Sequence, residues 1–184
     1  MKNEQQLLPF FRELQQKKDN EEFVIDKSGV KTVELIAPRL LLDPTQPMLE
    51  FNGRKTPKKY VQAETEWYDS MDLSVEEIGK SASIWNDICD ENGFINSNYG
   101  YLCFHPGNHC QFQNATKELK SNPDSRRSII IYTRPSIQYE YNSGGKSDFI
   151  CTLSHQFMIR NNKLQSVVQM RSNDAVFGLF NDLA

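Results

Sequence analysis

A cysteine and an arginine in the last third of the chain are the first candidates for chemistry. Cys151 lies in Asp-Phe-Ile-Cys-Thr-Leu-Ser-His-Gln-Phe, and Arg171 lies in Gln-Met-Arg-Ser-Asn-Asp. A thiolate is a nucleophile, and a guanidinium can both favour the thiolate and hold a phosphate. Because Asn161-Asn162 is a turn signal, we expect the two residues to be neighbours across a β-hairpin. The alternative is an inert core cysteine in an apolar strand.

Arg126 and Arg127 supply two more cations, in the segment Asn-Pro-Asp-Ser-Arg-Arg. Paired guanidinium groups at the start of a strand suit a phosphate, since each can bind it through two parallel hydrogen bonds. Arg171 followed by Ser172 is a similar pair of a cation and a hydroxyl donor. The alternatives are a solvated turn for the first pair and a salt bridge from Arg171 to Asp174. Together the segments describe an anion-binding site that contains a nucleophile.

Glu64 is the candidate for acid–base chemistry. It precedes Trp67 and Tyr68 by one helical turn, so on a helix it leans towards their aromatic side. A carboxyl group held against aromatic rings has a raised proton affinity and suits proton transfer. The alternative is an ordinary exposed carboxylate on a helix surface.

Apolar periodicity and turn signals predict the elements that must position these residues. Helices are expected at 5–22, at 60–71, after Ser74, at 83–90 and at 108–119. Strands are expected at 23–26, 31–42, 128–133, 148–160 and 164–171, with loops at 43–57 and loop or irregular strand at 93–101. We therefore expect one α+β domain over residues 1–184, with a mixed β-sheet and flanking helices. Its later strands would bring Arg127, Cys151 and Arg171 near one another.

The composition narrows the class of protein. The chain has 184 residues, of which 38% are hydrophobic and 24% charged, with a net charge of −3 at pH 7. Such a chain is long enough for a real core, and it has no basic face large enough for duplex nucleic acid. No apolar run approaches the roughly 18 residues that a membrane-spanning helix needs, so no membrane association is expected.

The cysteines indicate a reducing compartment and no metal. Four cysteines are present, none of them in a Cys-x-x-Cys pair, and the chain starts without an apolar leader. A cytoplasmic location is therefore expected. His105 and His109 flank Cys103 and Cys110 as in a metal cluster, but their spacing fits no standard zinc pattern.

A set of short motifs, taken in order, resembles the thymidylate synthase family. The motifs are Glu64-x-x-Trp67-Tyr68, Asn98-Tyr99-Gly100, Asp124-Ser-Arg-Arg127, Cys151 with Gln156-Phe157, and Arg171-Ser172-x-Asp174 with Gly178. Other segments resemble its phage deoxycytidylate hydroxymethylase branch: Asp26-Lys-Ser-Gly-Val-Lys-Thr32, Asn96-Ser-Asn-Tyr-Gly100, Asn122-Pro-Asp-Ser-Arg-Arg127, Tyr132-Thr-Arg-Pro-Ser136 and Met170-Arg-Ser-Asn-Asp174. The resemblance runs from Phe23 to the end, and the ordered set is far more specific than any single motif.

The resemblance implies a one-carbon transfer to a pyrimidine deoxynucleoside monophosphate. The Cys151 thiolate would add to C6 of the ring, which makes C5 able to attack the methylene of 5,10-methylenetetrahydrofolate, the co-substrate. Synthases of the family then accept hydride and make a methyl group, whereas hydroxymethylases add water. The branch implies conversion of dCMP to 5-hydroxymethyl-dCMP and release of tetrahydrofolate.

The resemblance also assigns roles to individual residues. The catalytic residues would be Cys151, Glu64, Tyr99 and Asp182. The residues that bind the phosphate would be Lys27, Arg126, Arg127, Arg171 and Ser172. Gln156 and Asn173 would lie near the nucleotide, and Trp85 and Asp174 would contact folate. The family's arginines at positions 126 and 127 cross into the partner's phosphate site, so a homodimer is implied.

Asp182 would select the base. Synthases have an asparagine at this position, which pairs with N3–H and O4 of uracil. An aspartate can accept from the amino group of cytosine and, when protonated, donate to its N3. We therefore expect dCMP to be preferred over dUMP, because a site built on buried hydrogen bonds rejects the wrong partner strongly.

Some residues depart from the family pattern. Ile150 stands where the family has proline, Thr152 stands where it has histidine, and His155 matches no catalytic position, which indicates a core or interface residue. The family continues beyond this point with a helix, a strand that binds the sugar and a tail that closes over folate, so a C-terminally truncated chain is implied. The alternatives are a thymidylate synthase that methylates dUMP and an inactive nucleotide-binding fragment.

Overall fold

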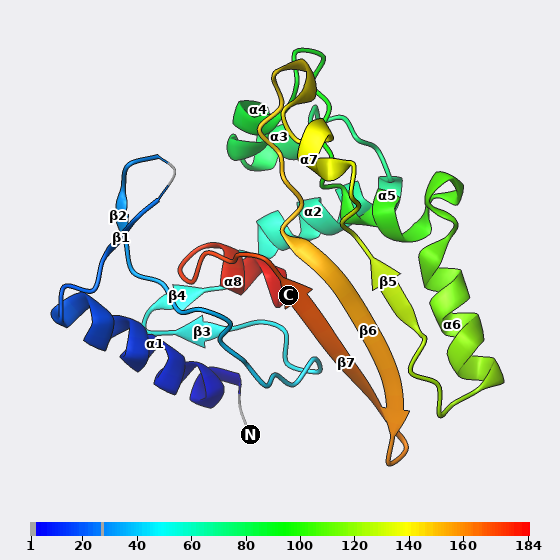
Figure 1. The fold of residues 1–184 in the computed structure, drawn as a ribbon, viewed down its shortest axis with the longest axis horizontal. Helices are drawn as coiled ribbons and strands as arrows, with labels where there is room; N and C mark the ends of the chain where they lie inside the picture. Colours follow the sequence, from blue (N-terminus) through cyan, green and yellow to red (C-terminus); the bar gives the residue numbers. More distant parts are fainter. Residues whose placement is uncertain (1–2, 27) are drawn as a thin grey trace. The chain divides into compact units, whose positions relative to one another are not determined.

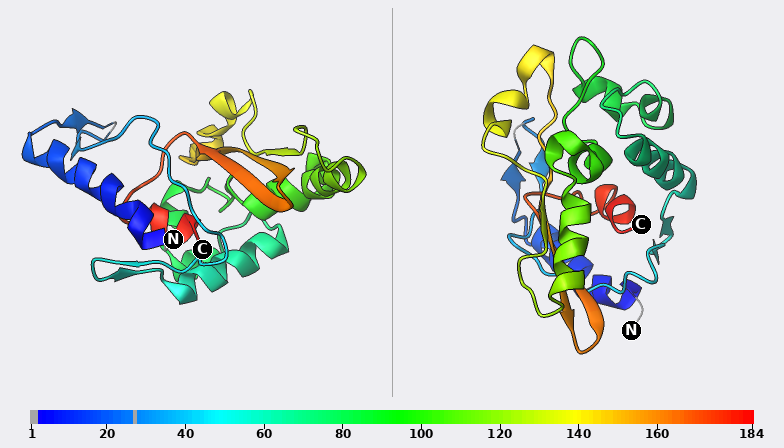
Figure 2. Two further views of the ribbon diagram at one scale, coloured as in Figure 1. Left: turned by 90° about the horizontal axis from the view of Figure 1, so that it is seen from below. Right: turned by 90° about the vertical axis from the view of Figure 1, so that its right-hand side faces the viewer.

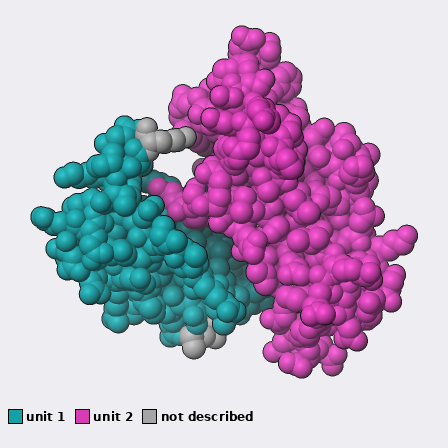
Figure 3. All heavy atoms as spheres, viewed as in Figure 1, with its two compact units in different colours: residues 1–57, 175–184 teal, residues 58–174 magenta. Residues whose placement is uncertain are grey.

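The computed structural model of the chain describes residues 3–26 and 28–184. Lys27, predicted to bind phosphate, lies outside the described residues. Two compact units make up the chain, residues 1–57 with 175–184 and residues 58–174 (Figure 3).

The first unit begins with helix α1 (Asn3–Asp19). Two short hairpins follow, β1 (Val24–Ile25) with β2 (Lys31–Thr32) and β3 (Glu50–Phe51) with β4 (Arg54–Lys55), and the unit includes helix α8 (Gly178–Asp182) (Figure 1). Its core gathers buried side chains from α1, from the residue before β3 and from α8: Leu7, Leu49, Leu179 and Phe180. The Thr56 hydroxyl donates to the carbonyl of Phe180 at 3.2 Å, which fixes α8 to the residues after β4.

The second unit contains most of the helices. They are α2 (Lys58–Ser70), α3 (Ile78–Ser81), α4 (Ile84–Ile88), α5 (Tyr99–Phe104), η1 (Pro106–Asn108), α6 (Gln111–Ser121), α7 (Ile137–Glu140) and η2 (Ser143–Gly145). The side chain of Asn98 caps α5 by accepting from the backbone N–H of Tyr101. Its amide group donates to the carbonyls of Trp67 and Asp72, so one buried residue both starts α5 and holds it to the end of α2.

A three-stranded antiparallel sheet forms the rest of the second unit. Its order is β5 (Ile129–Ile131), β6 (Thr152–Arg160) and β7 (Lys163–Met170). Asn161 and Asn162 both have positive φ, as the turn of a tight hairpin requires. Helix α6 packs along β5 and β6, and the right view of Figure 2 shows it running over the sheet.

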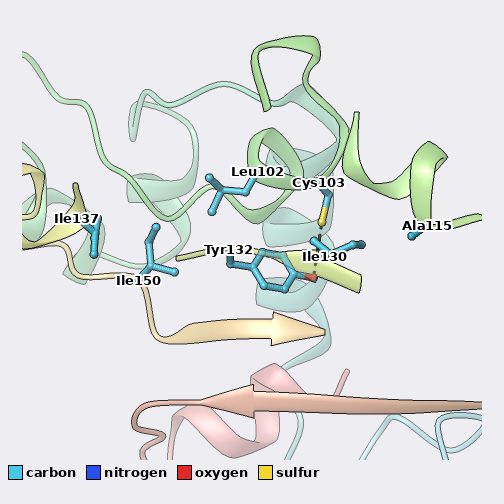
Figure 4. Close-up of a cluster of buried hydrophobic side chains, with 7 residues drawn as sticks. All are labelled: Leu102, Cys103, Ala115, Ile130, Tyr132, Ile137 and Ile150. Carbon is cyan, nitrogen blue, oxygen red and sulfur yellow. Dashed lines mark hydrogen bonds between the residues drawn. The ribbon is translucent and has the colours of Figure 1, made fainter. Parts of the chain in front are cut away.

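The larger of the two buried clusters in the second unit lies between the sheet, α5 and α6. It consists of Leu102, Cys103, Ala115, Ile130, Tyr132, Ile137 and Ile150 (Figure 4). The thiol of Cys103 contacts the hydroxyl of Tyr132 at 3.6 Å, shown as a dashed line in Figure 4. Because Ile150 is fully buried here, the residue before Cys151 is fixed by packing.

The predicted α+β class is confirmed, although the strand ladders among the described residues are antiparallel. Helices form close to most predicted positions. The predicted strand 31–42 is wrong beyond Lys31–Thr32, and the predicted loop 93–101 already contains the start of α5. Residues 148–151 were also predicted as strand, but β6 begins only at Thr152.

Candidate active site

Cys151 and Arg171 meet at one end of the β6–β7 hairpin. Cys151 immediately precedes β6 and Arg171 immediately follows β7, so antiparallel pairing brings them together. The backbone N–H of Arg171 donates to the carbonyl of Cys151 at 2.9 Å. The Arg171 Nη2 atom lies 3.5 Å from the Cys151 Sγ atom. The predicted proximity of the thiol and the cation is therefore confirmed.

The main chain around the cysteine holds the Arg171 guanidinium in place. Its Nε atom donates to the carbonyl of Ile150 at 3.1 Å, and Nη2 donates to the carbonyl of Phe149 at 2.9 Å. The guanidinium also lies over the Phe149 ring, 4.7 Å from its centre. A cation held in this position contacts the sulfur and can attract an anionic ligand.

Tyr99 contacts the same segment from α5. Its hydroxyl oxygen accepts hydrogen bonds from the backbone N–H groups of Cys151 at 3.3 Å and Thr152 at 3.1 Å. Burial raises the pKa of Tyr99, and the hydrogen bonds with Thr152 partly oppose that rise. A neutral phenol therefore lies beside the backbone of the candidate nucleophile. The role in proton removal that the resemblance implies for Tyr99 stays a prediction.

Glu64 belongs to a connected set of polar and aromatic side chains. The Tyr60 hydroxyl donates to its carboxylate at 2.8 Å, and the Trp85 indole N–H donates to the Tyr60 oxygen at 3.1 Å. Burial, and next the charge of Glu64, raise the pKa of Tyr68 well above its usual range. The Tyr68 ring in turn packs edge-on against Tyr99 at 5.8 Å between ring centres.

This set links two predicted site residues that are far apart in the sequence, since Glu64 and Trp85 share Tyr60. Sequence reasoning placed Glu64 beside Trp67 and Tyr68 but missed Tyr60. Its spacing of four residues from Glu64 on a helix was the available signal.

Arg127 does not lie near Cys151 and Arg171 within the chain, so that prediction is wrong. Sheet register is the reason, because β5 pairs with the middle of β6, and Ile129 is opposite Gln156. Arg127 sits before β5 and forms an ion pair with Glu118 at 3.1 Å. Exposed Arg126 accepts a hydrogen bond at its carbonyl from the Gln156 side chain at 2.8 Å.

The remaining predicted site residues lie in two segments, one directly after Arg171 and one in α8. Ser172, Asn173 and Asp174 form an exposed segment directly after Arg171, and the Asn173 amide contacts the Met170 sulfur at 3.4 Å. Asp182 is exposed in α8 of the first unit. The roles assigned to these residues stay predictions.

Within the described part of the chain, no group of three or more His, Cys, Asp or Glu side chains is arranged to hold a metal. All four cysteines are free thiols. Among the same residues, no helix has the length and apolarity needed to cross a bilayer.

The chain belongs to the thymidylate synthase family, whose sequence model, described as Thymidylate synthase, matches residues 10–184. It is 46% identical over 164 residues to Deoxycytidylate 5-hydroxymethyltransferase of Enterobacteria phage T4, covering 89% of this chain and 65% of that protein. The figures for the protein of the same name from Enterobacteria phage T2 are the same. Thymidylate synthase of Francisella philomiragia is 26% identical over 173 residues, covering 88% of this chain and 63% of that protein. The chain thus spans a little under two thirds of the length of these relatives.

Proposed function

We propose that the protein is a folate-dependent one-carbon transferase that acts on dCMP. The reaction joins dCMP, 5,10-methylenetetrahydrofolate and water to give 5-hydroxymethyl-dCMP and tetrahydrofolate. One observation carries the proposal, which is the Arg171 guanidinium 3.5 Å from the Cys151 sulfur. The family membership and the similarity to two phage deoxycytidylate 5-hydroxymethyltransferases support it.

Cys151 acts as the nucleophile in the proposed mechanism. Its thiolate bonds to C6 of the pyrimidine, and the electron pair of the C5–C6 double bond makes C5 nucleophilic. After C5 bonds to the one-carbon unit, loss of the C5 proton and departure of tetrahydrofolate leave an exocyclic methylene on the ring. Water adds its hydroxyl to this methylene, and the electron pair that returns to the ring restores the C5–C6 double bond as the sulfur leaves C6. Arg171 and Ser172 bind the phosphate, and Arg171 also stabilises the sulfur anion.

Glu64 and Tyr99 handle protons and water. Glu64 already accepts a hydrogen bond from Tyr60, so its carboxylate is oriented within a polar set next to Tyr68. Tyr99 keeps its proton because burial raises its pKa, so it can relay a proton from C5 without ionising first.

Trp85 and Asp174 would hold the folate, which supplies a one-carbon unit at the oxidation level of formaldehyde. The indole of Trp85 packs on Trp67 with ring centres 5.0 Å apart, and its N–H is bound to Tyr60. A ring fixed in this way suits contact with a flat heterocycle. The residues present therefore fit the co-substrate.

Asp182 selects the base in this proposal. A carboxyl group can bind the amino group and N3 of cytosine. In uracil the amino group is replaced by O4, so a carboxylate oxygen and O4 would be two acceptors facing each other. The preference for dCMP distinguishes the proposed activity from that of a thymidylate synthase.

A homodimer completes the proposed site. Directly paired residues share one face of a sheet, and on this face Ile129, Ile131 and Val167 are 40%, 52% and 45% exposed. An apolar sheet face of this kind is typical of a protein–protein interface. Arg126 and Arg127, which lie away from Cys151 in their own chain, would then serve the partner's phosphate site.

The decisive experiment follows tritium release from [5-³H]dCMP in the presence of 5,10-methylenetetrahydrofolate. We expect release with a hydroxymethyl product, no release from Cys151→Ser and unchanged release from Cys89→Ser. We expect dUMP to be turned over poorly, and Asp182→Asn to shift the preference towards dUMP. Equal turnover of both nucleotides by the parent protein would contradict the base selection, and a methyl product would indicate a thymidylate synthase.

A further inference from the structure

Asp148 is a buried charged residue that the proposed mechanism does not use. Its side chain is only 4% exposed. Oδ2 accepts from the backbone N–H groups of Asn96 at 2.6 Å and Ser97 at 2.8 Å, and Oδ1 accepts from the Ser97 hydroxyl. The Asn96 side chain returns a hydrogen bond to the Asp148 carbonyl at 3.1 Å. A carboxyl group with this many donors is fixed firmly, because losing any of them would leave a buried polar group without a partner.

These bonds join the two segments that carry Cys151 and Tyr99. Asp148 precedes Cys151 by three residues, while Asn96 and Ser97 immediately precede the Asn98 cap of α5 and Tyr99. The two segments are otherwise separated by about fifty residues, since the Ser97–Asp148 bond spans 51 positions. Asp148 therefore ties the segment that leads into Cys151 to the segment that leads into Tyr99.

The segment from Asp148 to Cys151 is held at each step. Asp148 anchors its start, the carbonyls of Phe149 and Ile150 bind Arg171, and Tyr99 binds the N–H of Cys151. This explains why the segment is not a strand although its residue types predicted one. A shift at Asp148 would move the two carbonyls that hold Arg171, and with them the guanidinium beside the sulfur.

We propose that Asp148 is a positioning residue, which keeps Tyr99 and Arg171 in register with Cys151 through its bonds to Asn96 and Ser97. The proposal rests on the proposed function only in taking Cys151 as the nucleophile. The proposed effect of Asp148 on the reactivity of the Cys151 thiol can be measured without substrate.

The test compares alkylation rates of the individual thiols by iodoacetamide, resolved by peptide mass spectrometry. In Asp148→Ala we expect Cys151 to react at least about fivefold more slowly, because the guanidinium that contacts its sulfur is displaced. Half-buried Cys110 should react as before, and buried Cys103 should stay protected. Asp148→Asn should stay within about twofold of the parent, since its amide oxygen can accept both N–H groups and its NH₂ can donate to the Ser97 hydroxyl.

Asp90→Ala is the matched control. Asp90 also accepts two backbone hydrogen bonds, from Asn92 at 3.0 Å and Phe94 at 2.9 Å, and it pairs with Lys146 at 3.3 Å, but it contacts neither Tyr99 nor Cys151 through these bonds. We expect no change at Cys151 in this variant. An unchanged or faster Cys151 reaction in folded Asp148→Ala would overturn the proposal.

If Cys103 becomes reactive in Asp148→Ala, that variant has unfolded, and Ser97→Ala decides instead. This change removes only the hydroxyl donor, and a slower Cys151 with protected Cys103 supports the proposal, whereas an unchanged Cys151 overturns it. In the active enzyme, Asp148→Ala should lower kcat more than it changes KM. Absence of turnover by the parent protein would contradict the proposed function. The alkylation rates would still test the proposed role of Asp148, because they are measured without substrate.

Discussion

The hydroxyl oxygen of Tyr99 accepts hydrogen bonds from the main chain at Cys151 and Thr152, at 3.3 and 3.1 Å. The cysteine backbone thus has a side-chain partner from a helix 52 positions earlier in the sequence. Because Tyr99 lies against Tyr68 and Tyr132, its ring is oriented before any ligand binds.

Tyr99→Phe should remove the acceptor for two N–H groups. We expect the free energy of unfolding to fall by about 1–3 kcal/mol, the usual cost of leaving buried donors without a partner. Urea unfolding measures this loss. Tyr132→Phe is the control, since its hydroxyl contacts only the Cys103 sulfur among the hydrogen bonds described, and it should cost clearly less than Tyr99→Phe. Equal losses in the two variants would show that the bonds of Tyr99 contribute little.

Arg171→Lys should slow the alkylation of Cys151 even though the charge is kept. A lysine ammonium cannot reproduce the fork that binds two carbonyls and contacts the sulfur at once. We expect about a tenfold slower reaction, or roughly 1.4 kcal/mol, and a weaker affinity for dCMP. Arg127→Lys, whose described side-chain partner is Glu118, should leave the alkylation rate unchanged. A normal rate in Arg171→Lys would mean that charge alone is sufficient.

His155 should make stability depend on pH in the acidic range. Burial lowers its pKa below the ordinary value of 6.5, so the folded state favours the neutral ring. Its stabilising contribution is present above pH 6.5 and is lost as pH falls through the lower folded pKa. In His155→Gln the free energy of unfolding should therefore decrease less as pH falls below 6.5.

The control for His155 is His109→Gln, a substitution of an exposed histidine. Chemical denaturation at a series of pH values gives both profiles. A profile of His155→Gln that matches the parent would rule out this residue as the source of the pH dependence.

Gly100→Ala should disrupt the contact between α5 and α2. A Cβ at this position would lie 1.7 Å from the Tyr68 carbonyl oxygen, which is backbone and cannot swing aside. We expect a loss above about 3 kcal/mol, at the upper end of overpacking effects. Gly79→Ala is the matched control, since its Cβ would meet only the movable Asn86 side chain. Thermal unfolding of both variants should show a much lower midpoint for Gly100→Ala.

The homodimer can be tested at the exposed sheet face. Ile131→Glu puts a charge on that face, so it should convert a dimer to a monomer in sedimentation experiments. Tyr139→Glu, a highly exposed position outside the sheet, should leave the dimer intact. Mixing Arg127→Ala with Cys151→Ser should restore activity if arginines serve the partner's site. A monomeric parent protein would contradict the proposal.

Local patterns in the sequence were enough to place Cys151 beside Arg171. The Asn161-Asn162 turn and the apolar alternation on each side of it determine the hairpin register, and register alone brings the two residues together. The helical spacing of Glu64 and Tyr68 likewise indicated their contact.

The start of α5 and the role of Asp148 could not be predicted in this way. Gly100 weakens the helical pattern, and it is present because α2 passes too close for a side chain. Asp148 lies among residues typical of a strand, and its partners are 51 and 52 positions away, so no periodicity reveals them. The position of Arg127 was predicted wrongly because the sequence did not determine where β5 starts along β6.

The Arg171 guanidinium is bound by carbonyl oxygens of residues 149 and 150, which every amino acid possesses. Proline, too, keeps its carbonyl while it loses its N–H. An isoleucine or a proline at position 150 would therefore offer Arg171 the same carbonyl acceptor. The side chains before Cys151 can therefore differ, provided that they still fill the core, without loss of the two bonds that hold the guanidinium beside the sulfur.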